Sequence, residues 1–400
     1  MISRDNRVNM LIGTGHFLSH FYGLCLPPMF LFWQGAFQVS YAQLGLAVML
    51  MAGTTAVLQT PVGFLVDRHG ARRFLIGGIL LMALGIAGMG LATAYWQVLV
   101  LAVVSGLGNS VIHPVDYAIM SGSVSKEGMA RSFSIHTFNG NLGNVSAPPV
   151  IIALSALLGW REALLLVGLL GVPLVLAVLL QSGILADQAR PQPGAGAKMV
   201  SGRQLLLTKP MLLFFGFYLL GAMAGAGVQA WLITVLHAVN GLGVEVASSA
   251  LTGYLAGVAS GVLVGGYAVG RLPGRMLGLV VLTTAISSAL MLAVAGASLP
   301  GIVVIVVMFG AGLGLGTTRT PRDMMLKEAA PAGQIGKVFG FVSSGLPLGT
   351  ALTPVPFGFL IDRGHPELVL VLVAVLLLAS LLCLGVARGS ARVALVAAAE

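Results

Sequence analysis

The sequence predicts an all-α integral membrane protein whose twelve transmembrane helices form two pseudo-symmetric six-helix halves. Of its 400 residues, 57% are hydrophobic and only 8% are charged, whereas soluble domains carry about 25% charged residues. Its apolar runs reach about 20 residues or more, the length that a helix needs to cross a bilayer. Polar motifs of the first half also recur in the second. A water-soluble globule is therefore excluded.

The apolar runs define the predicted helices and the domain boundaries. The longest polar segment, 184–209, separates an N-terminal half at 1–183 from a C-terminal half at 210–400, and it is interpreted as a cytoplasmic linker. The predicted spans are 8–32, 42–66, 74–94, 97–122, 132–157, 161–183, 211–236, 247–269, 276–296, 300–320, 335–360 and 367–388.

The placement of basic residues predicts the orientation. With both termini in the cytoplasm, every Lys and Arg except Arg161 and Arg363 falls on the cytoplasmic side, as the positive-inside rule requires. The net charge of +9 is thus attributed to topology and to attraction for anionic lipid headgroups, not to nucleic acid. We expect a multi-pass protein of a bacterial-type inner membrane. Cys25 and Cys383 lie inside apolar runs and indicate no disulfide or metal site, and no cofactor is expected.

A tight, charged turn follows the second apolar run, with the sequence Gly63-Phe-Leu-Val-Asp67-Arg68-His-Gly70-Ala-Arg72-Arg73. Gly63 is expected to let two helices approach closely. Gly70 suits the left-handed backbone of a sharp turn. Asp67 is expected to cap a helix or to pair with an arginine.

Sequence motifs repeat between the halves at a spacing of 206 or 207 residues. Pro-Val-Asp at 114–116 corresponds to Pro-Arg-Asp at 321–323, and Gly143 corresponds to Gly349. Two related halves with a site at their interface are typical of secondary transporters.

The charged turn resembles the loop between the second and third helices of the major facilitator superfamily. The segments at 58–63, 106–114 and 134–143 resemble the fosmidomycin-resistance branch of drug:proton antiporters. The resemblance covers about 13–150 and, weakly, 335–365. It implies alternating access and proton-driven efflux of a small solute. It also implies a conformational switch that closes the cytoplasmic side, formed by Gly63, Asp67, Arg68, Gly70, Arg72 and Arg131.

Two features depart from that branch. His20 stands where the branch tends to have an acidic residue, and the tenth span carries Arg319, Arg322 and Asp323. Both departures bear on the identity of the proton carrier and of the substrate.

His16 and His20 lie on one face of the first predicted helix, at i and i+4. An ionisable group at the bilayer centre costs about 2.5–3.5 kcal/mol on insertion scales, so it indicates a water-filled cavity or a partner. The pair is expected to line the cavity and exchange protons; the alternative is hydrogen bonding to neighbouring helices. Phe17 occupies the position that a zinc protease helix needs for glutamate, so that hypothesis fails.

Asp116 is the first candidate for proton coupling, with His20 and His113 as further candidates. It is the only acidic residue in the interior of a predicted span of the N-terminal half, because Glu162 lies at the very start of the sixth span. The alternative is a structural ion pair with Arg131 or Arg322.

The polar residues of the fifth span, together with Arg319, suggest the substrate class. Arg319 is expected either to bind a carboxylate or phosphonate or to snorkel as a topology charge. The candidate set is rich in His and Arg, which favours an anionic or neutral polar substrate over a cation. The substrate-binding candidates are His16, His20, His113, His136, Thr137, Asn141, Gln229 and Arg319.

Two directions of transport stay open at this point. The branch resemblance favours proton antiport and efflux, whereas the cationic candidates favour uptake of an organic anion with a proton. A transporter-like ligand sensor is a remote alternative. An enzyme is not expected, because no nucleophile–base set stands out. The partners expected are a small-molecule substrate, protons and the lipid bilayer, with the chain acting as a monomer.

Overall fold

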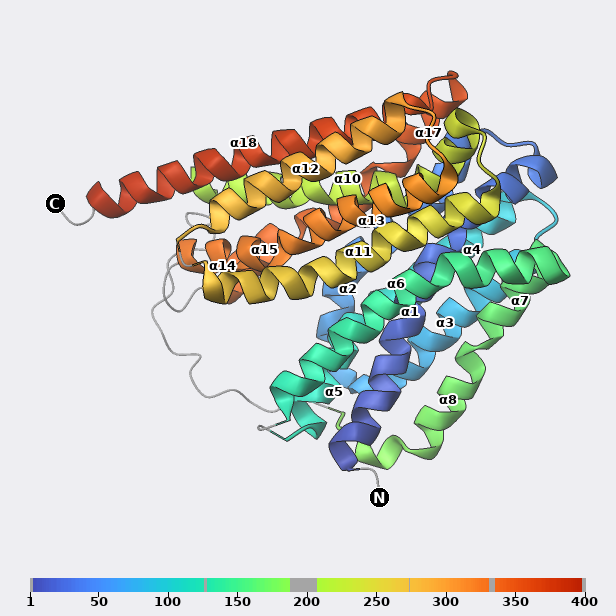
Figure 1. Cartoon of the computed structure of the whole chain (residues 1–400). Helices are drawn as coiled ribbons and strands as arrows, with labels where there is room; N and C mark the ends of the chain where they lie inside the picture. The colour runs from blue at the N-terminus through green and yellow to red at the C-terminus, as the bar shows by residue number, and fades with distance from the viewer. Residues whose placement is uncertain (1–2, 126–127, 188–206, 273, 331–334, 398–400) are drawn as a thin grey trace. The chain divides into compact units, whose positions relative to one another are not determined.

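The computed structural model describes residues 3–125, 128–187, 207–272, 274–330 and 335–397, and these residues are almost entirely helical (Figure 1). They form two compact units, Met1–Gln192 and Pro193–Glu400. The boundary between the units falls within the polar segment 184–209.

The first unit contains α1 (Arg4–Phe37), α2 (Tyr41–His69), α3 (Ala71–Leu91), α4 (Tyr95–Ser110), α5 (Ile112–Ser123), α6 (Met129–Leu158), α7 (Trp160–Leu169), α8 (Gly171–Leu180) and the short 3₁₀ helix η1 (Ser182–Ile184). Within it α1 packs on α6, α2 and α3 pack on α4, and α3 also packs on α7.

The second unit contains α10 (Lys209–Asn240), α11 (Val244–Arg271), α12 (Met276–Gly296), α13 (Gly301–Thr317), α14 (Arg319–Ala329), α15 (Ile335–Ser343), α16 (Gly345–Leu352), α17 (Pro354–Asp362) and α18 (Glu367–Ala397). Here α11 packs on α13, and α18 packs on α10 and α12.

Caps and glycines set the ends of several helices. Ser40 and Gln43 form a reciprocal capping box at the start of α2, which satisfies backbone donors that the helix leaves free. Gly70 joins α2 to α3 directly with a φ of 92°, and Gly159 joins α6 to α7 with a φ of 97°. A side chain is strained at such positive φ values, so the sharp turn predicted at Gly70 is present.

Each unit interrupts one helix at an equivalent position. Val111 separates α4 from α5, and Thr318 separates α13 from α14. Pro114 and Pro321 then occupy the first turn of the following segment, where a missing N–H is tolerated. The spacing between the two breaks matches the spacing of the sequence repeat, so the repeated motif corresponds to a repeated structural feature.

Eleven helical segments among the described residues are long and apolar enough to cross a membrane, and each corresponds to a predicted span. The remaining predicted span, 8–32, is the 34-residue helix α1, which His16, Ser19 and His20 make more polar than the others. The all-α membrane fold is confirmed. The predicted end of the tenth span at 320 was too early, because this segment continues through α14 to Ala329 and so contains Arg322 as well as Arg319.

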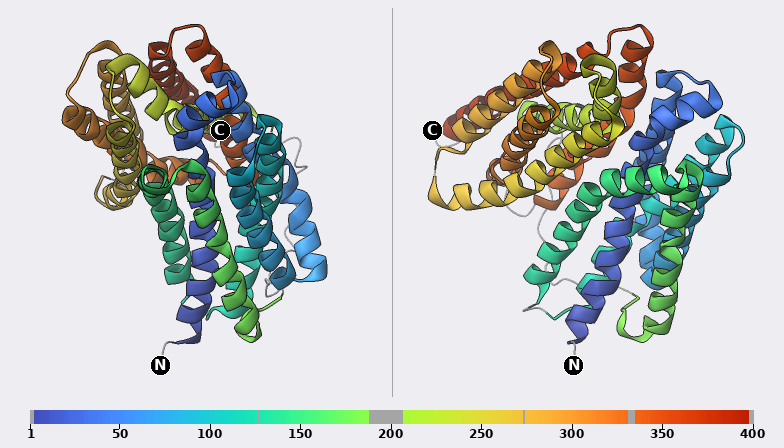
Figure 2. Two further views of the ribbon diagram at one scale, coloured as in Figure 1. Left: turned by 90° about the vertical axis from the view of Figure 1, so that its right-hand side faces the viewer. Right: turned by 45° about the vertical axis from the view of Figure 1, so that its right-hand side comes forward.

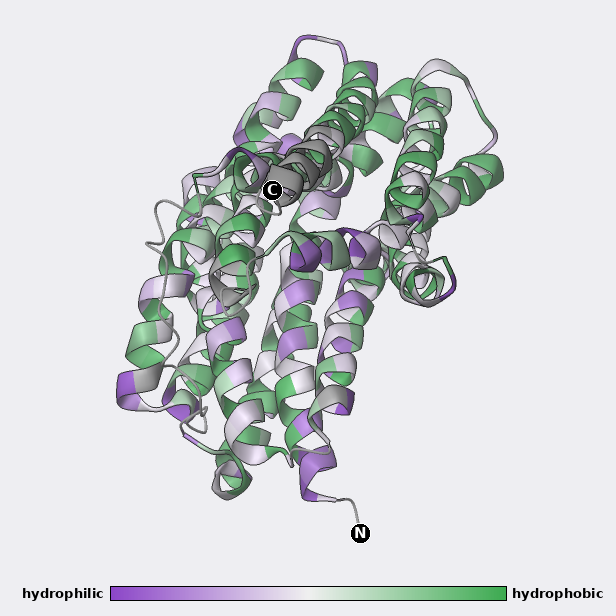
Figure 3. Cartoon of the chain, turned by 90° about the vertical axis from the view of Figure 1, so that its left-hand side faces the viewer, coloured by the Kyte–Doolittle hydropathy of each residue, from purple (hydrophilic) through white to green (hydrophobic). Residues whose placement is uncertain are grey.

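Apolar side chains cover much of the helical surface of each unit. Figure 3 shows hydrophobic residues along most of the length of the helices. Leu157, Leu263 and Leu382 are each more than 70% exposed. Exposed apolar area of this extent is costly in water but fits contact with lipid.

Candidate functional site

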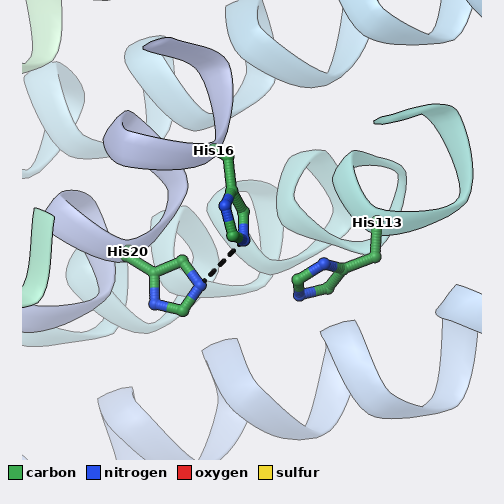
Figure 4. Close-up of side chains that lie close together, drawn as sticks. All are labelled: His16, His20 and His113. Atoms are coloured by element: carbon green, nitrogen blue, oxygen red, sulfur yellow. Dashed lines mark hydrogen bonds between the residues drawn. The ribbon is translucent and has the colours of Figure 1, made fainter. Parts of the chain in front are cut away.

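Three helices of the first unit bring four histidines together. His16 and His20 come from α1, His113 from the first turn of α5, and His136 from α6. Figure 4 shows the His16, His20 and His113 rings turned toward one another. His16 and His136 are buried, while His20 and His113 are half-buried.

The four imidazoles are in direct contact. The rings of His16 and His136 stack with centroids 3.6 Å apart, and the centroid of His113 lies 5.1 Å from that of His16. Nε2 of His20 lies 3.1 Å from Nε2 of His16. The sequence predicted these residues as separate candidates, and the structure gathers them into one cluster.

The close approach of α1 and α6, which run side by side (Figure 1, Figure 2), depends on two glycines of α6. A Cβ on Gly140 would lie 2.7 Å from Cε1 of His16, and a Cβ on Gly143 would collide with the backbone oxygen of Phe17. Both positions must therefore lack a side chain for the histidines to meet.

Asp116 is fully buried beside this cluster. Nε2 of His136 donates a hydrogen bond of 2.9 Å to Oδ2 of Asp116, while Oδ1 has no hydrogen-bond partner among the described residues. The alternative, a structural ion pair with Arg131 or Arg322, was wrong: the partner of Asp116 is His136, the Arg131 side chain is exposed, and Arg322 pairs with Asp323. A buried carboxylate needs such a partner or a proton.

Thr137 and Asn141 do not join the cluster. Thr137 is exposed, and the half-buried Asn141 uses its amide to bond the Thr137 carbonyl one turn earlier. Asn144, farther along the same helix, does reach it, because its Oδ1 lies 3.3 Å from Nδ1 of His20.

The second unit contains a partly open cavity of about 270 Å³ that both polar and apolar side chains line. Gln229 and Arg319, both predicted as substrate-binding residues, line it together with Tyr254 and Arg322. The backbone break at Thr318 starts α14 at Arg319, which places both arginines beside the cavity. Hydroxyl groups of Thr284, Thr318, Thr350 and Ser380 add to its polar wall.

The two arginines of the cavity differ in their partners. Nε of Arg322 lies 2.8 Å from Oδ1 of Asp323, and its guanidinium stacks 4.0 Å from the ring centre of Tyr218. The Tyr218 hydroxyl also donates to Asp323 at 2.5 Å. No hydrogen bond or ion pair joins Arg319 to any other residue in the part of the chain that the structure describes. Its charge is available to a ligand.

The charged turn between α2 and α3 is fastened to the segment after α8. Arg72 forms a 2.6 Å ion pair with Asp187, and the Asp187 Oδ1 accepts the Arg72 backbone N–H at 3.1 Å. Partial burial raises the pKa of Asp187, but the hydrogen bonds and charge of Arg72 outweigh it, so the pKa is lowered overall. Nothing in the sequence points to Asp187 as the partner, because it lies 115 residues from Arg72 along the chain.

The other residues of the predicted switch are less constrained. Arg68 is exposed, and the side chain of Asp67 lies outside the described residues. A Cβ on Gly63 would meet Pro114 at an ordinary 3.9 Å. The close helix approach predicted at Gly63 is therefore not seen.

Comparisons with known proteins agree with this architecture. A family model described as Major Facilitator Superfamily matches residues 12–246 and 235–394. The chain is 27% identical over 207 residues to a multidrug resistance protein B homolog of Mycobacterium tuberculosis, covering 51% of this chain and 37% of that protein. It is 30% identical over 129 residues to a probable sulfoacetate transporter of Cupriavidus necator, covering 32% and 30%. The matches thus span about a third of each relative's length.

A solved structure shows the same fold. A bacterial homolog to the human lysosomal transporter Spinster, in an inward-facing and occupied conformation, matches with a TM-score of 0.77 over 98% of this chain and 97% of that one. At 15% identity, this likeness concerns the fold alone.

Proposed function

The chain belongs to the major facilitator superfamily, and from that premise we propose that it is a secondary transporter that moves a small anionic or neutral polar solute by alternating access. The family and the fold are not those of an enzyme. We place the protein in the cell membrane as a monomer with both termini in the cytoplasm.

The observation that carries the substrate class is the unpaired Arg319 in the cavity of the second unit. Asp323 forms an ion pair with Arg322, whereas no acidic side chain among the described residues lies within ion-pair distance of Arg319. A guanidinium pairs best with a planar or tetrahedral oxyanion, which it binds through two parallel hydrogen bonds. A small carboxylate, sulfonate or phosphonate fits this charge, and the name of the sulfoacetate relative is consistent with it.

Binding of sulfoacetate and of short dicarboxylates to the purified protein tests this assignment. We expect thermal stabilisation of the wild type by at least one of these anions. Arg319→Gln should weaken that anion at least about tenfold, because a charge-assisted hydrogen bond contributes about 1.5–3 kcal/mol. Arg271→Gln is the matched control, since Arg271 stacks on Tyr267 away from the cavity. Equal affinity in Arg319→Gln and wild type would contradict the proposal.

Asp116 is the proposed proton carrier, and proton-coupled efflux is the proposed direction. Its support is the burial of the carboxyl group together with an oxygen that His136 leaves unbonded. Uptake of an organic anion with a proton remains the alternative. Deleting the gene separates the two: efflux predicts greater sensitivity to a toxic solute, whereas uptake predicts loss of growth on an organic acid.

The turn at 63–72, with Arg131, is the proposed conformational switch. Its support is the Arg72–Asp187 ion pair, which ties the start of α3 to the end of the first unit. A contact of this kind stabilises one arrangement of the cytoplasmic ends and must loosen in another.

A further inference from the structure

We propose that His16, His20 and His113 form a binding site for a divalent transition-metal ion such as Zn²⁺. The transport assignment above rests on the cavity of the second unit and on Asp116, so metal binding is a further role for three histidines that the sequence also offers as candidates for substrate binding and proton coupling. The metal assignment is independent of the substrate and of the direction of transport.

The geometry of the cluster is close to that of three ligands on one ion. One ring nitrogen from each histidine lies within 4.8 Å of the others, and the two Nε2 atoms of His16 and His20 are 3.1 Å apart. Zinc binds imidazole nitrogen at about 2.0–2.1 Å, so two ligands on one ion lie within about 4.2 Å of each other. A small rotation of the His113 ring closes the difference.

The hydrogen bonds on the outer sides of His16 and His20 make their facing nitrogens acceptors. Nδ1 of His16 donates to the carbonyl oxygen of His136 at 2.8 Å, which leaves its Nε2 with a lone pair. Nδ1 of His20 faces Oδ1 of Asn144 at 3.3 Å, which likewise assigns the proton to Nδ1. Two neutral rings in these tautomers present lone pair to lone pair at 3.1 Å. Such a contact is repulsive unless a metal ion or a shared proton lies between the two nitrogens or His20 takes its other tautomer.

The surroundings match those of metal-binding histidines. Ligating imidazoles typically donate their second N–H to a carbonyl oxygen, as His16 does to His136 and His20 to Asn144. Nδ1 of His113 is buried without a hydrogen-bond partner among the described residues, so His113 carries an unused donor or acceptor beside the pair. Three protein ligands leave the fourth tetrahedral position open for water or an anion.

Neighbouring charge also favours a cation here. The carboxylate of Asp116 bonds His136 at 2.9 Å, and the His136 ring stacks on that of His16. A sequence search misses this site, because His113 joins the H-x-x-x-H pair only through the packing of α5 against α1.

The test is zinc titration of the full-length protein in detergent, with any affinity tag removed, against a chromogenic chelator. We expect one tight site in the wild type. His16→Ala, His20→Ala and His113→Ala should each weaken it at least about tenfold. His237→Ala is the matched control, because His237 is an exposed histidine of α10 that bonds the Leu242 carbonyl. Wild-type zinc affinity in all three cluster variants would overturn the site.

A second measurement needs no variant. Co²⁺ bound by three imidazoles and one further ligand gives the intense visible absorption of a tetrahedral ion. We expect that spectrum from the wild type and its loss when Zn²⁺ is added. The weak spectrum of a six-coordinate, water-bound ion would overturn the proposal even if an alanine variant fails to fold.

Discussion

At the scale of single residues, the pairing of Asp116 with His136 explains how a carboxyl group is tolerated inside the first unit. The side chains are 0% and 4% exposed, so neither can rely on water. Removing one partner of such a pair leaves the other buried and unsatisfied, which costs more than the pair contributes.

His136→Ala should therefore destabilise the protein by about 1–3 kcal/mol, the cost of an unsatisfied buried polar group. Thermal unfolding in detergent measures it. The neighbouring Thr137→Ala is the control, and its effect should stay within about 0.5 kcal/mol because Thr137 is exposed. The double variant His136→Ala with Asp116→Asn should recover part of the loss. If His136→Ala and Thr137→Ala lowered the free energy of unfolding equally, the His136–Asp116 pair would not be the source of the loss.

At the scale of elements, the packing of α1 against α6 depends on the missing side chains of Gly140 and Gly143. An added methyl group at Gly143 meets backbone, which cannot move aside as a flexible side chain can. The histidine cluster exists only at this helix separation.

Gly143→Ala should destabilise the protein by about 1–3 kcal/mol through overpacking. Gly23→Ala, in α1, is the matched control because a Cβ there meets nothing within 4 Å. That control should be neutral or stabilising by up to about 1 kcal/mol, since alanine favours helix over glycine. Thermal unfolding of both variants measures these stabilities. If Gly143→Ala were as stable as the wild type, α1 and α6 could separate without cost, which would contradict this explanation.

The link between the turn after α2 and the end of the first unit should depend on pH. Because Arg72 lowers the pKa of Asp187, the ion pair stabilises the protein above the ordinary aspartate pKa of about 3.9. That stabilisation is lost as the pH falls through the lowered value in the folded state. Both side chains are more than a third exposed, so the contribution is at most about 1 kcal/mol.

We expect wild type to be slightly more stable than Asp187→Asn at pH 7 and equal to it once Asp187 is protonated in acid. Glu328→Gln, which changes an exposed carboxylate of α14, should show no such difference. A stability gap that persists unchanged in acid would rule out the ion pair as its source.

At the scale of the whole molecule, the sequence predicted the class of fold because apolar length and positive-inside charge act locally along the chain. It also showed the repeat that puts Pro114 and Pro321 at matching positions, and the structure interrupts each helix three residues before these prolines, at Val111 and Thr318. It could not predict which polar side chains meet. Asp116 and His136 are 20 residues apart, and Arg72 and Asp187 are 115 apart, so their pairing depends on tertiary packing. His136 and Thr137 were both predicted to bind substrate. Because successive residues of a helix point in different directions, only His136 faces the cluster.

The boundary of the tenth span shows the same limit. In the sequence, Arg319 and Arg322 resemble the basic residues that flank a membrane span on its cytoplasmic side. Their charges alone therefore predict that the tenth span ends near them. The structure continues the helix to Ala329 and surrounds both arginines with hydroxyl and aromatic groups of the second unit. Only the neighbouring helices reveal that these charges line a cavity.

Proton movement in liposomes that contain the purified protein and a pH dye tests proton coupling through Asp116 directly. A pH gradient is imposed, and organic anions are added one at a time. We expect proton flux that depends on one anion, that falls at least about tenfold in Asp116→Asn, and that persists in Thr137→Ala. Protons and solute that cross the membrane in opposite directions indicate antiport. Protons and solute that cross in the same direction indicate symport. Solute transport without proton flux, or flux unchanged in Asp116→Asn, would contradict proton coupling through Asp116.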